Sequence, residues 1–255
     1  MRRKKIISID VTIGSKADFI EQIVTFGRAR QASYVCLANV HMCVEAYRDK
    51  TFANVVNCAD LISADGMPLV KALKLFYGID QDRLAGMDLL PDLIAASEHG
   101  GLSVYLYGST DKVLSAISKR IAEEHPGLVF AGAYAPPFRA QTPDEEVEEV
   151  RKINCSGANI VFVALGCPKQ ERWMARNRDK IHAVLVGVGG AFPVYAGFQT
   201  RAPLWMQRYS LEWLFRLFQE PARLWKRYLV TNSIFFALLI SEKCRMMLMK
   251  KGSTQ

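Results

Sequence analysis

Residues 159–174 read NIVFVALGCPKQERWM. The apolar run 159–164 predicts a buried strand, which leads into Gly166, Pro168 and the polar cluster 169–172 (Lys-Gln-Glu-Arg). In open α/β sheets, ligands bind at the carboxyl ends of strands. The stretch therefore predicts a small-molecule site that offers an amide, a cation and a backbone turn.

Strand-like and helix-like patterns alternate over the first 200 residues. We expect strands at 6–11, 34–37, 61–62, 103–107, 128–131, 159–164 and 183–188, and helices at 16–28, 41–48, 67–77, 89–99, 111–124, 144–156 and 169–177. Strands that alternate with helices predict an α/β fold with a mostly parallel sheet and helices on both faces.

The composition indicates a globular protein with reduced thiols. Half of the 255 residues are hydrophobic and 23% are charged. The six cysteines form no CxxC pair and most lie in apolar segments, which favours structural thiols over disulfides or a zinc site. The basic start MRRKKIISIDV lacks the apolar core of a signal peptide, and no run reaches the roughly 18 apolar residues of a membrane span.

The chain changes character after Thr200, so we divide it into an α/β core (1–200) and a basic amphipathic helical appendage (201–255). From Arg201 onward there are ten Lys or Arg against three Glu, a net charge of +7. The first 200 residues carry 23 basic and 22 acidic residues, a net +1. A basic helix with a Trp/Phe/Leu face is typical of a membrane interface. The alternative, a helical pair docked on the core with a solvated face, stays open.

Two motifs contain carboxylates. In ADLISADGMPLV, Asp65 follows a short strand and precedes Gly66, a common place for a catalytic carboxylate. From spacing alone, an ordinary helix N-cap explains Asp65 more simply. Asp80-Gln81-Asp82 matches the metal-binding DxD of many glycosyltransferases, but it follows a helix-like run, so we interpret it as a solvated turn.

Other polar or glycine-rich turns follow predicted strands or precede helices. Arg83 is suited to hold a phosphate, or else to form a surface ion pair. Gly108 opens a βα turn that offers a helix N-terminus to an anion. Gly189 and Gly190 allow close approach of a ligand or a neighbouring loop, because the segment VGVGGAF is not a dinucleotide-binding GxGxxG. Motifs of metal hydrolases, serine hydrolases and P-loop NTPases are absent from the sequence.

These stretches together resemble one family. ADGMPLV, RLAGMDL, VYLYGST, SGANIVFVALGCPKQERWM, GVGGAFPVYAG, RAPLWMQ and LEWLFRLFQEPARLWKRYL are similar, in order and spacing, to the WecG/TagA/CpsF glycosyltransferases. The resemblance implies a Rossmann-like fold and sugar transfer from a UDP-sugar to a saccharide on undecaprenyl diphosphate. It also implies inversion at the anomeric carbon, no essential metal or other cofactor, and an appendage that meets the membrane.

The resemblance also assigns roles to residues. It makes Asp65 the general base, against the capping interpretation. It places Arg83 and Gln170 on the donor, and Asn39 near the acceptor. Leu37 stands where better-studied members have Thr, so any role of that hydroxyl is absent here. Basic positions expected to hold the lipid diphosphate are Arg216, Arg223 and Arg227.

The variants ANVHM, ADGMP and GCPKQERWM resemble exopolysaccharide-cluster members of the glucosyltransferase, GumM-like kind. We therefore expect UDP-glucose as donor, with an N-acetylmannosamine transferase as the alternative. We expect an enzyme on the cytoplasmic face of the bacterial plasma membrane, bound peripherally and able to form a homo-oligomer. A non-catalytic basic lipid-binding module is the alternative from another class. Nucleic acid is disfavoured because the core is nearly neutral.

Overall fold

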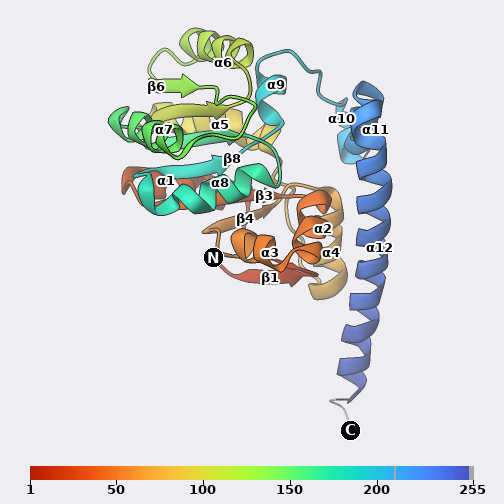
Figure 1. Cartoon of the computed structure of the whole chain (residues 1–255). Coiled ribbons are helices and arrows are strands. Elements are labelled where there is room, and N and C mark those ends of the chain that lie inside the picture. Colours follow the sequence, from red (N-terminus) through yellow and green to blue (C-terminus); the bar gives the residue numbers. More distant parts are fainter. Residues whose placement is uncertain (210, 253–255) are drawn as a thin grey trace.

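The computed structural model describes residues 1–209 and 211–252, with the side chains of residues 208, 223 and 249–252 outside the description. Its centre is a six-stranded, wholly parallel sheet with the strand order β4-β3-β8-β7-β5-β6 (Figure 1). The predicted α/β class is confirmed. The strands are β3 (Ser33–Ala38), β4 (Leu61–Ala64), β5 (Ser103–Gly108), β6 (Val129–Tyr134), β7 (Ile160–Ala164) and β8 (Val184–Gly187).

The expected first strand at 6–11 is wrong. The chain forms an antiparallel hairpin there, β1 (Arg3–Ile6) and β2 (Ile9–Thr12), because Ile7 adopts a positive φ of 56° and reverses the direction. The hairpin is attached to the main sheet where Ile62 N–H donates to the Thr12 hydroxyl at 3.0 Å. A period-2 pattern cannot show a turn in the middle of an apolar run.

Helices cover both faces of the sheet. Alternate strand residues point to opposite faces, so Tyr34 and Cys36 pack into one core cluster while Val35 and Leu37 pack into the other. The first cluster takes α2, α3, α4 and α8, and the second takes α1, α5, α6 and α9. The core helices are α1 (Lys16–Arg28), α2 (Val40–Arg48), α3 (Lys50–Asn57), α4 (Met67–Tyr77), α5 (Gly86–His99), α6 (Asp111–Glu124), α7 (Pro143–Cys155), α8 (Lys169–Asn177) and α9 (Ala191–Tyr195).

Local capping explains where several helices begin. Ser15 and Thr142 each form a capping box with the acidic residue three positions on. The sequence analysis missed α3, which Asp49 caps by accepting from the N–H groups of Thr51 and Phe52. Asp49 also ends α2, so two helices follow each other without the Gly or Pro that usually separates them.

The C-terminal part is helical, as expected, but one helix dominates it. It contains α10 (Leu204–Arg208), α11 (Glu212–Gln219) and the 32-residue α12 (Pro221–Gly252), which runs along the core beside α2 and α4 (Figure 1). Phe235 of α12 is fully buried in the core cluster of α2 and α4. Within the described residues, every helix is too short or too polar to cross a membrane. The division at residue 200 stays a prediction.

Candidate active site

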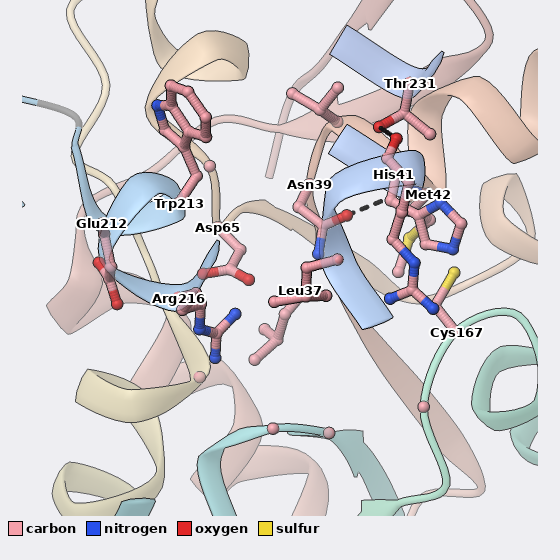
Figure 2. A pocket seen from close by; sticks show the side chains of 18 of the residues that line it. Leu37, Asn39, His41, Met42, Asp65, Cys167, Glu212, Trp213, Arg216 and Thr231 are labelled. Atoms are coloured by element: carbon pink, nitrogen blue, oxygen red, sulfur yellow. Dashed lines mark hydrogen bonds between the residues drawn. The ribbon is translucent and has the colours of Figure 1, made fainter. Parts of the chain in front are cut away.

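A cavity of about 650 Å³ lies at the carboxyl ends of β3, β4, β7 and β8. Its floor is the sheet edge with the loops that leave it, and α11 and α12 form the opposite wall (Figure 2). The loops at the strand ends and the C-terminal helices therefore enclose one space. Most predicted site residues with described side chains line it: Asn39, Asp65, Arg83, Gln170, Gly189, Gly190, Arg216 and Arg227.

Asp65 directly follows β4 and faces the cavity (Figure 2). Its N–H donates to the Ala38 carbonyl at 2.8 Å, which extends the β3–β4 ladder by one bond and fixes the backbone. The N-cap of α4 is Gly66, and no side chain caps that helix. The capping interpretation of Asp65 is therefore wrong, and its carboxylate is left to face the cavity.

Burial raises the pKa of the Asp65 carboxyl to about 6. The charges of Arg216 and Arg83 act in the opposite direction and favour the carboxylate, while Glu212 and Asp88 raise the pKa further. A carboxyl with this pKa is mostly ionised at neutral pH and is still a better proton acceptor than an exposed aspartate. This combination suits a general base.

Arg83 joins the core to the appendage. Its guanidinium donates to Glu212 of α11, and it lies 3.4 Å from Asp88 of α5. Asp88 also binds Arg201 at 2.6 Å. Arg83 thus lines the cavity as expected, but two carboxylates hold it in this structure. Its predicted contact with a donor phosphate stays a prediction.

Gln170 shapes the glycine turn beside the cavity. Its Oε1 accepts from the Gly189 N–H at 3.1 Å, and its Nε2 donates to Glu171 at 3.1 Å. A Cβ on Gly187 would lie 2.4 Å from that Nε2, so only glycine leaves room for the amide. The side chain is 4% exposed, which leaves little of it to a ligand. Its predicted role as a donor contact stays a prediction.

Glu171 lies fully buried under this turn, with one carboxylate oxygen unpaired among the described residues. Burial raises the pKa of its carboxyl. Its other oxygen, Oε1, accepts from the Gln170 amide, and this bond holds that amide in one orientation.

Asn39 begins α2 and faces the cavity near Asp65 (Figure 2). Its Oδ1 accepts from the Met42 N–H at 3.1 Å, so the amide NH₂ group is the part left to face a ligand. Leu37 lines the cavity two residues earlier, where it offers an apolar surface and no hydroxyl. Asn39 therefore caps α2 through its side-chain oxygen. Its NH₂ group is a candidate for donating a hydrogen bond to the acceptor sugar.

The appendage places cations in the cavity. A Cβ on Gly190 would lie 3.1 Å from Nη2 of Arg216, so the guanidinium packs against the glycine turn. Arg227 lines the cavity from α12, and its charge helps burial to lower the pKa of His41. The side chain of Arg223 lies outside the described residues.

Gly108 has a packing role and does not line this cavity. Its φ is 107°, and a Cβ would lie 2.6 Å from the Ala164 carbonyl oxygen, which explains glycine at the end of β5. The Asp80-Gln81-Asp82 segment is an exposed turn, as interpreted, in which Asp80 pairs with Lys74 at 2.6 Å. Neither carboxylate lines the cavity.

The sequence analysis did not single out three cavity residues: Glu212, Trp213 and His41. Glu212 and Trp213 belong to the quoted LEWLFRL segment, in which the sequence analysis assigned a substrate role to Arg216 alone. A helical pattern shows that two faces exist, but it does not show that one of them covers a distant strand end.

A buried carboxylate at the carboxyl edge of a parallel sheet, facing a cavity that several guanidinium groups also line, is suited to a transferase with an anionic substrate. Residues 4–248 match the model of the glycosyl transferase WecG/TagA/CpsF family. The chain belongs to this family, which confirms the resemblance, and it is a glycosyltransferase.

Several relatives match this chain in sequence over most of their length. The Bacillus spizizenii N-acetylglucosaminyldiphosphoundecaprenol N-acetyl-beta-D-mannosaminyltransferase is 31% identical over 95% of this chain and 93% of its own. The Bacillus subtilis enzyme of the same name is 30% identical over 82% and 80%. The Staphylococcus aureus one is 27% identical over 87% and 85%.

These relatives correct one expectation. All three carry the name of an N-acetylmannosaminyl transferase, so the prediction of a GumM-like, UDP-glucose-dependent exopolysaccharide enzyme is wrong. The motif variants that suggested it contain Asn39, Asp65 and Gln170, which line the cavity, together with buried residues that pack in the core. Choice between donor sugars depends on a few pocket atoms that such variants do not report.

Proposed function

We propose that this protein transfers N-acetylmannosamine from UDP-N-acetylmannosamine to N-acetylglucosaminyl-diphospho-undecaprenol. The names of the relatives support the substrates. The observation that carries the chemistry is Asp65, a carboxylate with a pKa raised to about 6, facing a cavity that Arg83 and Arg216 also line.

Asp65 acts as the general base. A hydroxyl of the acceptor sugar loses its proton to the carboxylate as its oxygen bonds to the anomeric carbon of the donor. The bond from that carbon to the diphosphate oxygen breaks, and its electron pair leaves with UDP. General-base assistance of this kind contributes about 10²- to 10⁴-fold to the rate.

Arg216 and the glycine turn face the place where the leaving charge is expected. Guanidinium groups stabilise a diphosphate without a metal ion, because each offers several N–H donors in a fixed plane. Arg83 can also stabilise the diphosphate when its guanidinium binds Glu212 and a phosphate oxygen at the same time. We propose that the reaction requires no metal, with these cations in its place.

The appendage holds the enzyme at the cytoplasmic face of the plasma membrane. Of the 19 large hydrophobic side chains described as exposed, 11 lie between Leu204 and Leu248, in less than a fifth of the chain. The chain from Arg201 onward also has +7 of the net charge of +8. Apolar and basic groups together bind an anionic lipid surface. Association into a homo-oligomer stays a prediction.

The test is transfer of label from UDP-N-acetylmannosamine to the lipid-linked acceptor in EDTA, by the wild type and Asp65→Asn. We expect transfer by the wild type and a loss of at least about 10²-fold in the variant. UDP-glucose should be at least tenfold poorer as donor. A requirement for a divalent ion would contradict the metal-free mechanism.

The same assay separates an enzyme from a basic lipid-binding module. A module would bind anionic vesicles and release no UDP from the donor, with or without acceptor. The carboxylate at the strand end favours the enzyme, because lipid binding alone requires no acid inside the cavity.

A further inference from the structure

Four side chains of α11 line the cavity, and three of them contact residues of the core. Glu212 binds Arg83, Arg216 packs on the Gly190 turn, and Gln219 donates to the Thr200 carbonyl at 2.9 Å. The fourth, Trp213, lines the cavity and is 41% exposed.

Trp213 is held in a fixed orientation. Its ring meets that of Tyr228 on α12 edge to face, with centroids 5.9 Å apart and planes at 82°. Such pairs stabilise one ring geometry beyond the effect of burial. An aromatic side chain that only enters lipid needs no partner inside the cavity, and Trp205 and Trp225, which are more exposed, do not line it.

Trp213 and Arg216 lie on different sides of Asp65 in the view of Figure 2. In an inverting transfer, the acceptor oxygen enters on the face of the anomeric carbon opposite to the leaving diphosphate. The diphosphate belongs with the cation and the glycine turn. The acceptor sugar therefore enters from the side of Trp213.

We propose that Trp213 is the platform on which the N-acetylglucosamine ring of the acceptor packs, so that its reacting hydroxyl meets Asp65. A pyranose has an apolar face of C–H groups, and an indole offers a flat apolar surface of matching size. The inference rests on the proposed function and adds a specificity residue to it. It also means that the acceptor site is complete only when α11 is docked.

The test uses the full-length protein and a water-soluble acceptor, N-acetylglucosaminyl diphosphate with a short alkyl chain, so that membrane binding does not contribute. We expect Trp213→Leu to raise the acceptor KM about ten- to hundredfold. The acceptor KM of Trp213→Phe, which keeps a smaller ring, should lie between those of the wild type and Trp213→Leu. The donor KM should not change.

Phe218→Leu is the matched control, because Phe218 lies on the same helix, is 74% exposed and does not line the cavity. It should leave the acceptor KM unchanged. Thermal unfolding of all three variants should match the wild type within a few degrees, so that a KM effect is not a folding effect.

Three results would overturn the inference. An unchanged acceptor KM in Trp213→Leu, with transfer lost only on vesicles, would make Trp213 a membrane anchor. A raised donor KM would make it a donor platform. Failure of the wild type to use N-acetylmannosamine at all would overturn the proposed function, and this inference with it.

Discussion

The two walls of the cavity are built in different ways. The core wall places Asp65, Asn39 and the Gly189 turn by backbone hydrogen bonds at the ends of buried strands. The appendage wall places Glu212, Trp213 and Arg216 on α11, a helix with no fully buried residue among those described. One wall is rigid by construction, and the other depends on how α11 docks.

This difference divides the tasks of the site. A base that must meet a reacting hydroxyl within a few tenths of an ångström is best placed on a strand end. Groups that hold a lipid-linked substrate have to let it enter and leave. A wall held by the Arg83–Glu212 pair, by hydrogen bonds such as that from Gln219 to the Thr200 carbonyl and by side-chain packing can open while the base stays in place. The following changes test that division.

The largest expected effect concerns the core wall. The pKa of Asp65 in the fold, about 6, lies above the unfolded value of 3.8, so the fold prefers the protonated form. Ionisation of the buried Asp65 carboxyl therefore destabilises the fold. This destabilisation is absent below about pH 4 and reaches its full size above about pH 6. Asp65→Asn should therefore raise the free energy of unfolding by about 3 kcal/mol at pH 7.5, a gain that shrinks as the pH falls to 4.

Urea unfolding at pH 4 and pH 7.5 measures this difference. The exposed Asp82→Asn is the control and should show no such gain. In the wild type, kcat/KM should fall as the pH decreases through about 6, because the base becomes protonated. Equal stability of Asp65→Asn and wild type at pH 7.5 would contradict a costly buried carboxylate.

The next largest effect concerns the ion pair that joins Arg83 of the core wall to Glu212 of the appendage wall. Glu212→Gln removes a partner of Arg83 in a pair that is only 13–16% exposed. We expect docking of α11 to weaken by about 2 kcal/mol, or about thirtyfold. Trypsin should then cut the chain faster after Arg201. Glu242→Gln, which loses only a pair with Arg245 within α12, is the control. Equal cleavage rates would show that packing alone holds the appendage.

The smallest effect belongs to the outer face of the appendage. Leu229 on α12 is 63% exposed and does not line the cavity. Leu229→Ser should weaken binding to anionic vesicles by about 1 kcal/mol, or about fivefold, and leave transfer to a soluble acceptor unchanged. Val147→Ser, an equally exposed position on α7, should not alter vesicle binding. Equal losses from both would show that the appendage has no special affinity for lipid.

Much of the fold followed from patterns in the sequence. Helices α1, α4, α6 and α8 begin and end where the sequence predicts, because the apolar period agrees with a local signal at one end of each helix. Ser15 and Thr110 cap α1 and α6, Gly78 ends α4, and Pro168 precedes α8. The hairpin at Ile7 and the helix α3 were missed, since neither a single positive φ nor a shared cap such as Asp49 leaves a distinctive pattern.

The site was predicted less evenly. Asp65 and Asn39 follow strands, so their place at the sheet edge could be inferred. Gly108 follows a strand too, but glycine is required there because Ala164 on the neighbouring strand approaches closely. No local sequence pattern shows such an approach. Gln170 was expected to meet substrate, whereas its observed bonds hold the Gly189 turn.

The sequence by itself determined the parallel sheet, the strand-end carboxylate, the basic amphipathic appendage and the family. These depend on local periodicity, local chemistry and motif order. Only the tertiary structure decided that α11 closes the cavity, that Arg83 binds Glu212, and that Trp213 lines the same cavity as Asp65. The last two join residues more than 100 positions apart. Such contacts depend on how the apolar face of α12 packs on α2, and no local signal encodes that geometry.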